Sequence, residues 1–93
     1  MNAAARVRAE ELAQEYRSDH IRPDGRKGTS ALKDQGLSYS YAAECIGGGH
    51  DSASEIANAW LNSSKHCEKI TNERCNNAGV ARCGTYWVLL LMN

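Results

Sequence analysis

The sequence predicts a small α+β domain in which helices pack on both sides of a short sheet. Two patterns of amphipathic helix cover residues 3–17 and 52–61. A strand pattern covers residues 39–46, and two more, residues 78–83 and 86–92, flank Gly84-Thr85 as a β-hairpin. With 93 residues the chain forms one domain with a core of limited size.

The first helix is predicted from one apolar stripe, formed by Ala5, Ala9, Leu12, Ala13 and Tyr16. The charged side chains of this segment, Arg8 and Glu11 among them, fall mostly off the stripe, so we expect them on the solvated face. Pro23-Asp24-Gly25 then predicts a turn. Residues 30–35 predict a short helical turn, ended by Gly36 in the left-handed conformation.

The next elements are a strand, a helix and the hairpin. Residues 39–46 alternate around two tyrosines and are followed by three glycines, which favour a flexible loop. Ser52 and Glu55 predict a capping box, and an apolar stripe follows it at Ala53, Ile56, Ala57, Trp60 and Leu61. Residues 62–64 are expected to end this helix. Residues 86–92 are nearly all apolar, which predicts a central strand covered on both faces.

The composition excludes two classes of partner. Lysine plus arginine and aspartate plus glutamate each number 11, so the formal charge is zero and no basic block could neutralise a run of phosphates. Nucleic acid is therefore not expected as a main partner. No stretch approaches the roughly 20 apolar residues of a membrane span, and residues 1–6 lack a hydrophobic signal core.

Four cysteines in a small domain favour two disulfides and an oxidising compartment. The alternative is four free thiols in a cytosolic protein. No C-x-x-C pair is present, which argues against a structural zinc site. Three pairings are open to Cys45, Cys67, Cys75 and Cys83, and their spacing does not choose among them.

Three separated residues are candidates for a shared polar site: His20, Glu44 and His66. Taken singly, His20 could be an exposed loop histidine, and His66 could complement a helix dipole. Glu44 ends an apolar strand, where a carboxylate needs a partner. Together, two imidazoles and a carboxylate can bind a metal, hold a polar ligand or transfer a proton. No nucleophile motif accompanies them.

Four ordered motifs resemble the CAP superfamily of cysteine-rich secretory, antigen 5 and pathogenesis-related proteins, also called SCP domains. Residues 18–25 are similar to F-S-H-T-R-P-D-G of bacterial members, and residues 43–46 to G-E-N-I. Residues 60–70 are similar to W-M-N-S-P-G-H-R-x-N-I. The hairpin residues 78–81 and 86–89 match the motif that ends the domain.

The resemblance implies an α/β/α sandwich with a central antiparallel sheet and a cleft lined by two histidines and two acids. Carried over, these are His20, His66 and Glu44, while Asn58 stands at the position of the second acid. Glu55, one turn earlier, could substitute weakly. In some members the cleft holds a metal, so His20 and His66 are candidate ligands for zinc or another divalent ion, although no cofactor is required.

The resemblance also bears on the cysteines and on assembly. Cys45 and Cys67 lie beside cleft residues, which suggests a Cys45–Cys67 bridge and leaves Cys75–Cys83 as the second. Residues 1–93 form a single domain of this type that lacks the family's first helix. An uncovered apolar strand would then favour self-association, most simply as a two-fold dimer. The alternative is a monomer whose loops cover the bare face.

These features predict a secreted binding domain with no reaction of its own. Its partner would be a small ligand, a lipid or another protein. The first alternative is a metal-dependent hydrolase or protease that uses the histidine and glutamate cleft. The second is an inactive, truncated remnant of such a domain.

Overall fold

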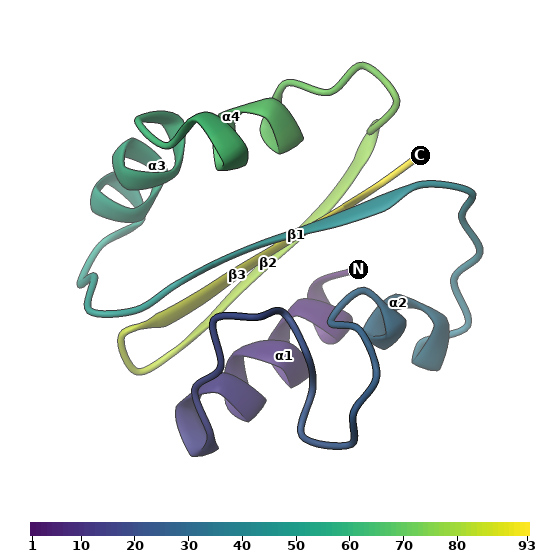
Figure 1. The fold of residues 1–93 in the computed structure, drawn as a ribbon, viewed down its shortest axis with the longest axis horizontal. Coiled ribbons are helices and arrows are strands. Elements are labelled where there is room, and N and C mark those ends of the chain that lie inside the picture. Colours follow the sequence, from purple (N-terminus) through teal and green to yellow (C-terminus); the bar gives the residue numbers. More distant parts are fainter.

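The computed structural model describes residues 1–93, apart from the side chains of Ser64 and Cys67. Two helices pack on each face of a three-stranded sheet (Figure 1). This confirms the α+β class and the sandwich with an antiparallel sheet. The elements in chain order are α1 (Asn2–Gln14), α2 (Ser30–Asp34), β1 (Ala42–Gly47), α3 (Ala53–Leu61), α4 (Ser64–Ile70), β2 (Asn77–Cys83) and β3 (Tyr86–Met92).

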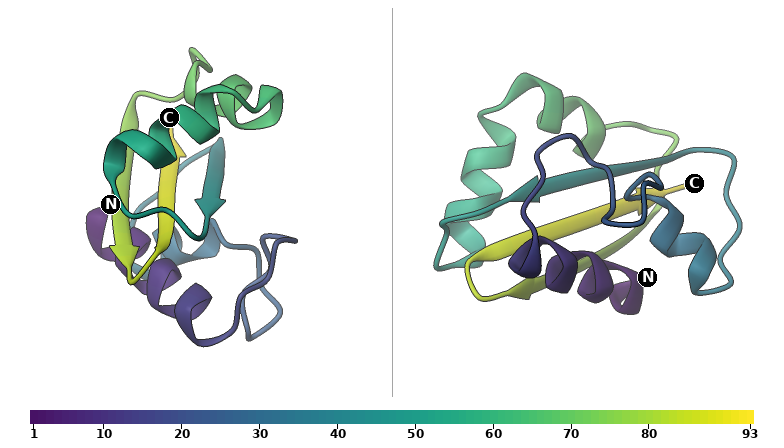
Figure 2. Two further views of the ribbon diagram at one scale, coloured as in Figure 1. Left: turned by 90° about the vertical axis from the view of Figure 1, so that its left-hand side faces the viewer. Right: turned by 60° about the horizontal axis from the view of Figure 1, so that its bottom comes forward.

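The central strand is β3, and the strand order is β1-β3-β2 with both pairings antiparallel. Met92 lies opposite Ala42 on one side and Asn77 on the other. Because side chains alternate along a strand, Val88 and Leu90 pack on the α1 side of the sheet, while Trp87 packs with α3. Figure 2 shows the helices on opposite sides of the strands. The predicted burial of β3 on both faces is therefore confirmed.

Helix α1 is turned relative to the predicted stripe. Its buried residues are Ala4, Ala5, Arg8, Ala9 and Leu12. Ala13 and Tyr16 are exposed instead. Alanines on the inner face let the helix approach β2 and β3 closely. The expectation that Arg8 faces solvent is wrong: it is 1% exposed, because acidic partners inside the fold match its charge.

The second helical layer contains the predicted cap and one helix that the sequence did not suggest. Ser52 Oγ accepts the Glu55 backbone N–H at 3.2 Å, while the Glu55 carboxylate accepts from Asp51 N at 3.0 Å. Helix α3 ends at Leu61, close to the expected point. Residues 62–63 do not lead into a loop, however, since α4 starts at Ser64 and carries His66.

Both faces of β3 are covered in this single chain. Helix α1 contacts β2 and β3 on one face, and Trp60 of α3 packs with Trp87 on the other. The expectation of a bare apolar strand is therefore wrong. A two-fold dimer and the absence of the family's first helix both stay predictions. Among the described residues, no helix is long and apolar enough to cross a membrane.

The expected Cys45–Cys67 bridge lies outside the described residues, and the expected Cys75–Cys83 bridge is absent. Cys45, Cys75 and Cys83 are free thiols, and the Cys67 side chain lies outside the described residues. The predicted Cys75–Cys83 bridge is wrong because β2 separates the two residues. A strand of seven residues at about 3.3 Å per residue spans roughly 20 Å, whereas bridged Cα atoms lie about 4.4–6.8 Å apart. Cys83 also packs on the α1 side of the sheet, and Cys45 on the α3 side.

We therefore predict that the chain holds at most one internal disulfide, and that Cys83 is not part of it. Mass spectrometry of unreduced protein after air oxidation should show no more than the mass deficit of a single S–S bond. Alkylation should label Cys83, and Cys83→Ser should leave the deficit unchanged. A deficit matching two S–S bonds in a monomer would contradict the arrangement of the strands.

Candidate functional site

The centre of the candidate site is a buried carboxylate. Glu44 lies on β1 and is 3% exposed. Arg8 donates to it through Nε at 2.6 Å and Nη2 at 2.9 Å, and His20 Nδ1 lies 2.9 Å from Oε1. A bidentate pair of hydrogen bonds from a guanidinium is among the strongest interactions that a carboxylate makes in proteins. Both oxygens of Glu44 are therefore engaged by side chains of the protein.

The electrostatics keep Glu44 ionised. Burial opposes the charge, but hydrogen bonds from His20 and Arg8 outweigh it and hold the pKa of Glu44 below its ordinary value. An ionised carboxylate only accepts, so the His20 Nδ1–H is the donor. This fixes the proton of neutral His20 on Nδ1 and leaves Nε2 as the nitrogen available to a ligand.

His20 is held in an uncommon backbone conformation. Its φ of 63° is left-handed, which few residues other than glycine adopt. Its carbonyl accepts from Gly28 N at 2.8 Å, and Asp19 Oδ1 accepts from Ile21 N at 3.0 Å. The neighbouring bridge between Ile21 and Lys27 closes the loop. The surrounding contacts thus fix a strained residue in position, as is common at functional sites.

Gly28 is a site residue that the sequence reasoning missed. It is buried against Glu44, and a Cβ at this position would overlap both carboxylate oxygens. Glycine is therefore required so that the loop can approach the carboxylate closely. No motif made this glycine stand out, because the contact joins residues from the loop and β1.

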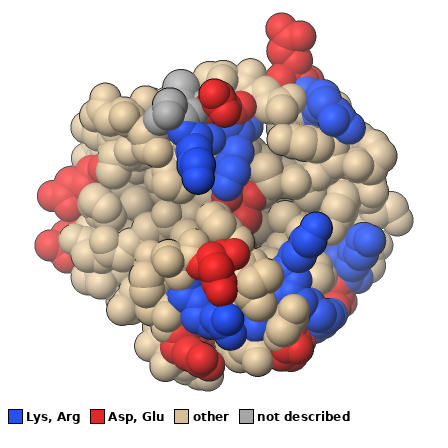
Figure 3. Space-filling view, viewed as in Figure 1, with Lys and Arg blue, Asp and Glu red and all other residues tan. Residues whose placement is uncertain are grey.

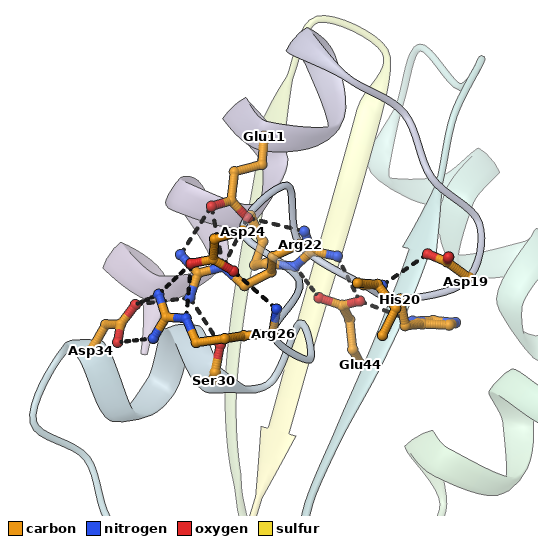
Figure 4. Close-up of polar contacts among 11 residues, drawn as sticks. Glu11, Asp19, His20, Arg22, Asp24, Arg26, Ser30, Asp34 and Glu44 are labelled. Carbon is orange, nitrogen blue, oxygen red and sulfur yellow. Dashed lines mark hydrogen bonds and ion pairs between the residues drawn. The ribbon is translucent and has the colours of Figure 1, made fainter.

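The loop is anchored by a network of ion pairs around Arg22 (Figure 4). Arg22 is 4% exposed. Its Nη2 lies 2.9 Å from Glu11 Oε2, and its Nη1 lies 2.8 Å from Asp34 Oδ2. Arg26 Nη1 lies 2.8 Å from Asp34 Oδ1, and Arg26 Nη2 lies 2.8 Å from Asp24 Oδ2. The predicted turn is confirmed, with Gly25 N donating to Arg22 O and a Gly25 φ of 89°. Glu11 is thus part of the support of the loop and not of a purely solvated face.

His66 faces the same groove from the opposite layer. It lies on α4 and lines a pocket together with His20, Tyr16 and Lys69. Burial lowers the pKa of His66, and the positive charges of Lys69, His20 and Lys65 lower it further. The ring is therefore neutral near pH 7. Its Nδ1 is buried with no hydrogen-bond partner among the described residues, which leaves Nε2 as the nitrogen that a ligand can reach.

Lys69 connects the two layers at this point. Its Nζ donates to Glu44 O at 2.8 Å, so α4 is tied to β1. A cavity of about 400 Å³ opens beside it, lined by Ile21, Lys27, Tyr41 and Glu44 among others. Two adjoining pockets share His20 and Lys69 with this cavity, which makes one continuous groove. Figure 3 shows basic side chains on both sides of a hollow near the centre of this face.

The described residues do not fit a catalytic metal. Both oxygens of Glu44 are already engaged, Glu55 caps α3, and Asn58 is exposed and lines none of the three pockets. In the part of the chain that the structure describes, no cluster of three histidine, cysteine or acidic side chains could hold an ion. Zinc sites normally use at least three protein ligands. His20 and His66 supply two of these ligands at most, and their role as metal ligands stays a prediction.

The comparison with known proteins identifies the family. The model of the cysteine-rich secretory protein family, CAP, matches residues 1–89. This chain belongs to the CAP family. The uncharacterised protein YkwD of Bacillus subtilis is 28% identical to this CAP domain over 89 residues, which are 94% of this chain and 35% of YkwD.

Solved structures share the fold of this CAP domain. An extracellular protein with an SCP domain from Bacillus anthracis has a TM-score of 0.92 at 18% identity, covering 99% of this chain and 31% of that one. An outer surface protein of Borrelia burgdorferi has a TM-score of 0.78 at 22% sequence identity, and the match covers 98% of this chain and 74% of that protein. A cysteine-rich secretory protein of Staphylococcus aureus has a TM-score of 0.72 at 18% sequence identity, and the match covers 98% of this chain and 30% of that protein. This CAP domain thus spans about a third of YkwD and of two of the structures.

We predict that Gly28→Ala disrupts the site by displacing the Glu44 carboxylate from Arg8 and His20. The protein should lose about 1–3 kcal/mol of unfolding free energy, as expected for overpacking, and the ring resonances of His20 should shift. Thr29→Ala is the matched control, since no side-chain hydrogen bond caps α2 there. Equal stability of the Gly28→Ala and Thr29→Ala variants in urea would contradict the close approach.

We also predict that Glu44→Gln leaves Arg8 buried without its counterion and removes about 3–5 kcal/mol at pH 7. In the parent protein the pKa of Glu44 is lowered on folding, so its contribution is complete above the ordinary value of 4.5 and is lost as the pH falls through the folded pKa. The free energy of unfolding, measured with urea, should fall less steeply between pH 7 and pH 3 for Glu44→Gln than for the parent protein. Exposed Glu10→Gln should follow the parent, and a Glu44→Gln curve parallel to the parent would contradict this role.

Proposed function

We propose that this CAP domain is exported and binds a small molecule in the groove around His20, Glu44 and His66 without transforming it. The observation that carries the proposal is the engagement of both Glu44 oxygens by Arg8 and His20. A carboxylate held in this way supports the walls of a binding site. It has no free oxygen with which to take a proton from water or to bind a metal.

The shape of the groove also favours a small ligand. A cavity of about 400 Å³ lies in the range typical of small-molecule sites, about 300–1,000 Å³. Its lining combines apolar side chains such as Ile21 and Tyr41 with polar groups from separate elements. The fixed backbone of His20 and the anchored loop mean that the site is formed before a ligand arrives.

Export is supported by the relatives. Two structures that share the fold are described as an extracellular protein and an outer surface protein, and a third as a secretory protein.

A hydrolase is the second candidate, and one observation favours it. His20 donates its Nδ1–H to Glu44, which is the orientation in which a carboxylate supports a histidine as general base. His20 Nε2 could then take a proton from water. The cations nearest to His20 in the groove are lysines on flexible stems, whereas oxyanion stabilisation requires donors held in a fixed position, so we place binding first.

Two assays on the same protein test this proposal. Amide spectra recorded with a library of small fragments should show shifts grouped at His20, Lys65, His66 and Lys69. Ester and peptide substrates should turn over no faster than in buffer, with or without zinc. His66→Ala should abolish the grouped shifts, while His50→Ala should retain them, because His50 contributes its backbone carbonyl to Trp87. Turnover that is lost in His20→Ala would establish the hydrolase instead.

A further inference from the structure

The arginines and lysines of this chain are used differently. The salt bridges found among the described residues are made by arginines and by His20. The chain has four lysines, and three of them, Lys27, Lys65 and Lys69, line the groove. The arginine charges are therefore mostly neutralised within the fold, while the lysine ammonium groups remain available to a ligand.

The acids beside the groove do not neutralise these lysines. Glu44 is paired with Arg8, and Asp19 is paired with Arg17 at 3.1 Å. Glu68 is exposed and lines one of the pockets between Lys65 and Lys69. One acid thus faces three ammonium groups, and a concave surface with such an excess attracts anions.

The donors are also placed to converge. Lys69 uses one N–H on Glu44 O, and an ammonium has three donors, so others remain free. Lys65 and His66 lie on α4 and line one pocket together with Lys69. His20 lines the opposite side of that pocket, but its N–H is already donated to Glu44. Next to this pocket, Ile21, Ala42 and Ala43 line the cavity of about 400 Å³. A ligand with a charged head and a short apolar body could therefore place its head among the polar side chains and its body along the apolar ones.

Resting on the proposed function, we infer that the ligand of this groove is a small organic anion. Its carboxylate or phosphate head binds between Lys65, Lys69 and the Nε2–H of His66, and its apolar body lies along Ile21 and Ala43 towards Lys27. The same excess of positive charge disfavours a divalent cation at His20 and His66. The inference thus specifies the chemistry of the ligand and the polarity of the site together.

The test uses the whole chain and four probes: hexanoate, hexyl phosphate, inorganic phosphate and neutral octyl glucoside. Amide spectra should report saturable binding of the two organic anions in the groove, weaker binding of inorganic phosphate and no saturation with octyl glucoside. Lys65→Met should weaken hexanoate binding about two- to fivefold, the effect of one exposed charge pair. Lys33→Met is the matched control, since Lys33 is exposed on α2 over Tyr39 and should change binding less than twofold.

Other outcomes separate the two proposals. Equal binding of octyl glucoside, or an equal effect of Lys33→Met, would overturn the anion inference and leave a binding groove in place. Binding to vesicles containing phosphatidylglycerol without binding of soluble hexanoate would also overturn it, in favour of a membrane surface. Hydrolysis of esters that depends on His20 would overturn the proposed function itself.

Discussion

The buried pair of Arg8 and Glu44 is the interaction on which the rest of the structure depends. It joins the inner face of α1 to β1, and it also supplies the acceptor that orients His20. A buried ion pair is poor evidence of added stability, because desolvation offsets much of the attraction. Its value here is geometric. The pair fixes the position of the Glu44 carboxylate, against which the loop packs. Only glycine fits at position 28, because a Cβ there would overlap the carboxylate.

The fold separates charges that hold the structure from charges that meet solvent in the groove. Arginine presents a planar fork that suits paired carboxylates, whereas lysine is a compact charge on a flexible stem. Arg8, Arg22 and Arg26 connect α1, the loop and α2 through such forks. The lysines of α4 lie on the facing wall. A domain with zero formal charge can thus present a basic concave surface.

Local patterns in the sequence predicted the elements, and motifs predicted the family, but neither predicted the supporting contacts. The cap at Ser52 depends on neighbours within one element, so the local sequence reveals it. The stripe of α3 was only partly right, since Ile56 and Trp60 are buried while Ala53, Ala57 and Leu61 are exposed. Strand β1 starts at Ala42, after the two tyrosines, and residues 43–46 are all buried instead of alternating. Arg8 was misplaced because its burial depends on Glu44, 36 residues away. The helix α4 was missed because Asn62-Ser63-Ser64 predicted the end of the helical region, whereas Ser64 starts a new helix. The convergence of His20 and His66 on one groove required the motifs, since neither residue has a distinctive local context.

The position of β3 has a consequence for how the chain acquires its structure. The strand lies between β1 and β2, yet it follows every other described element in the sequence. During synthesis from the N-terminus, β1 therefore has no partner strand until residues 86–92 are made, and its pairing of Ala42 with Met92 closes a long loop. Such distant pairings slow folding. Until then Glu44 and the helices that pack on the sheet have no complete sheet to bury them, so the sandwich forms only when β3 joins β1 and β2.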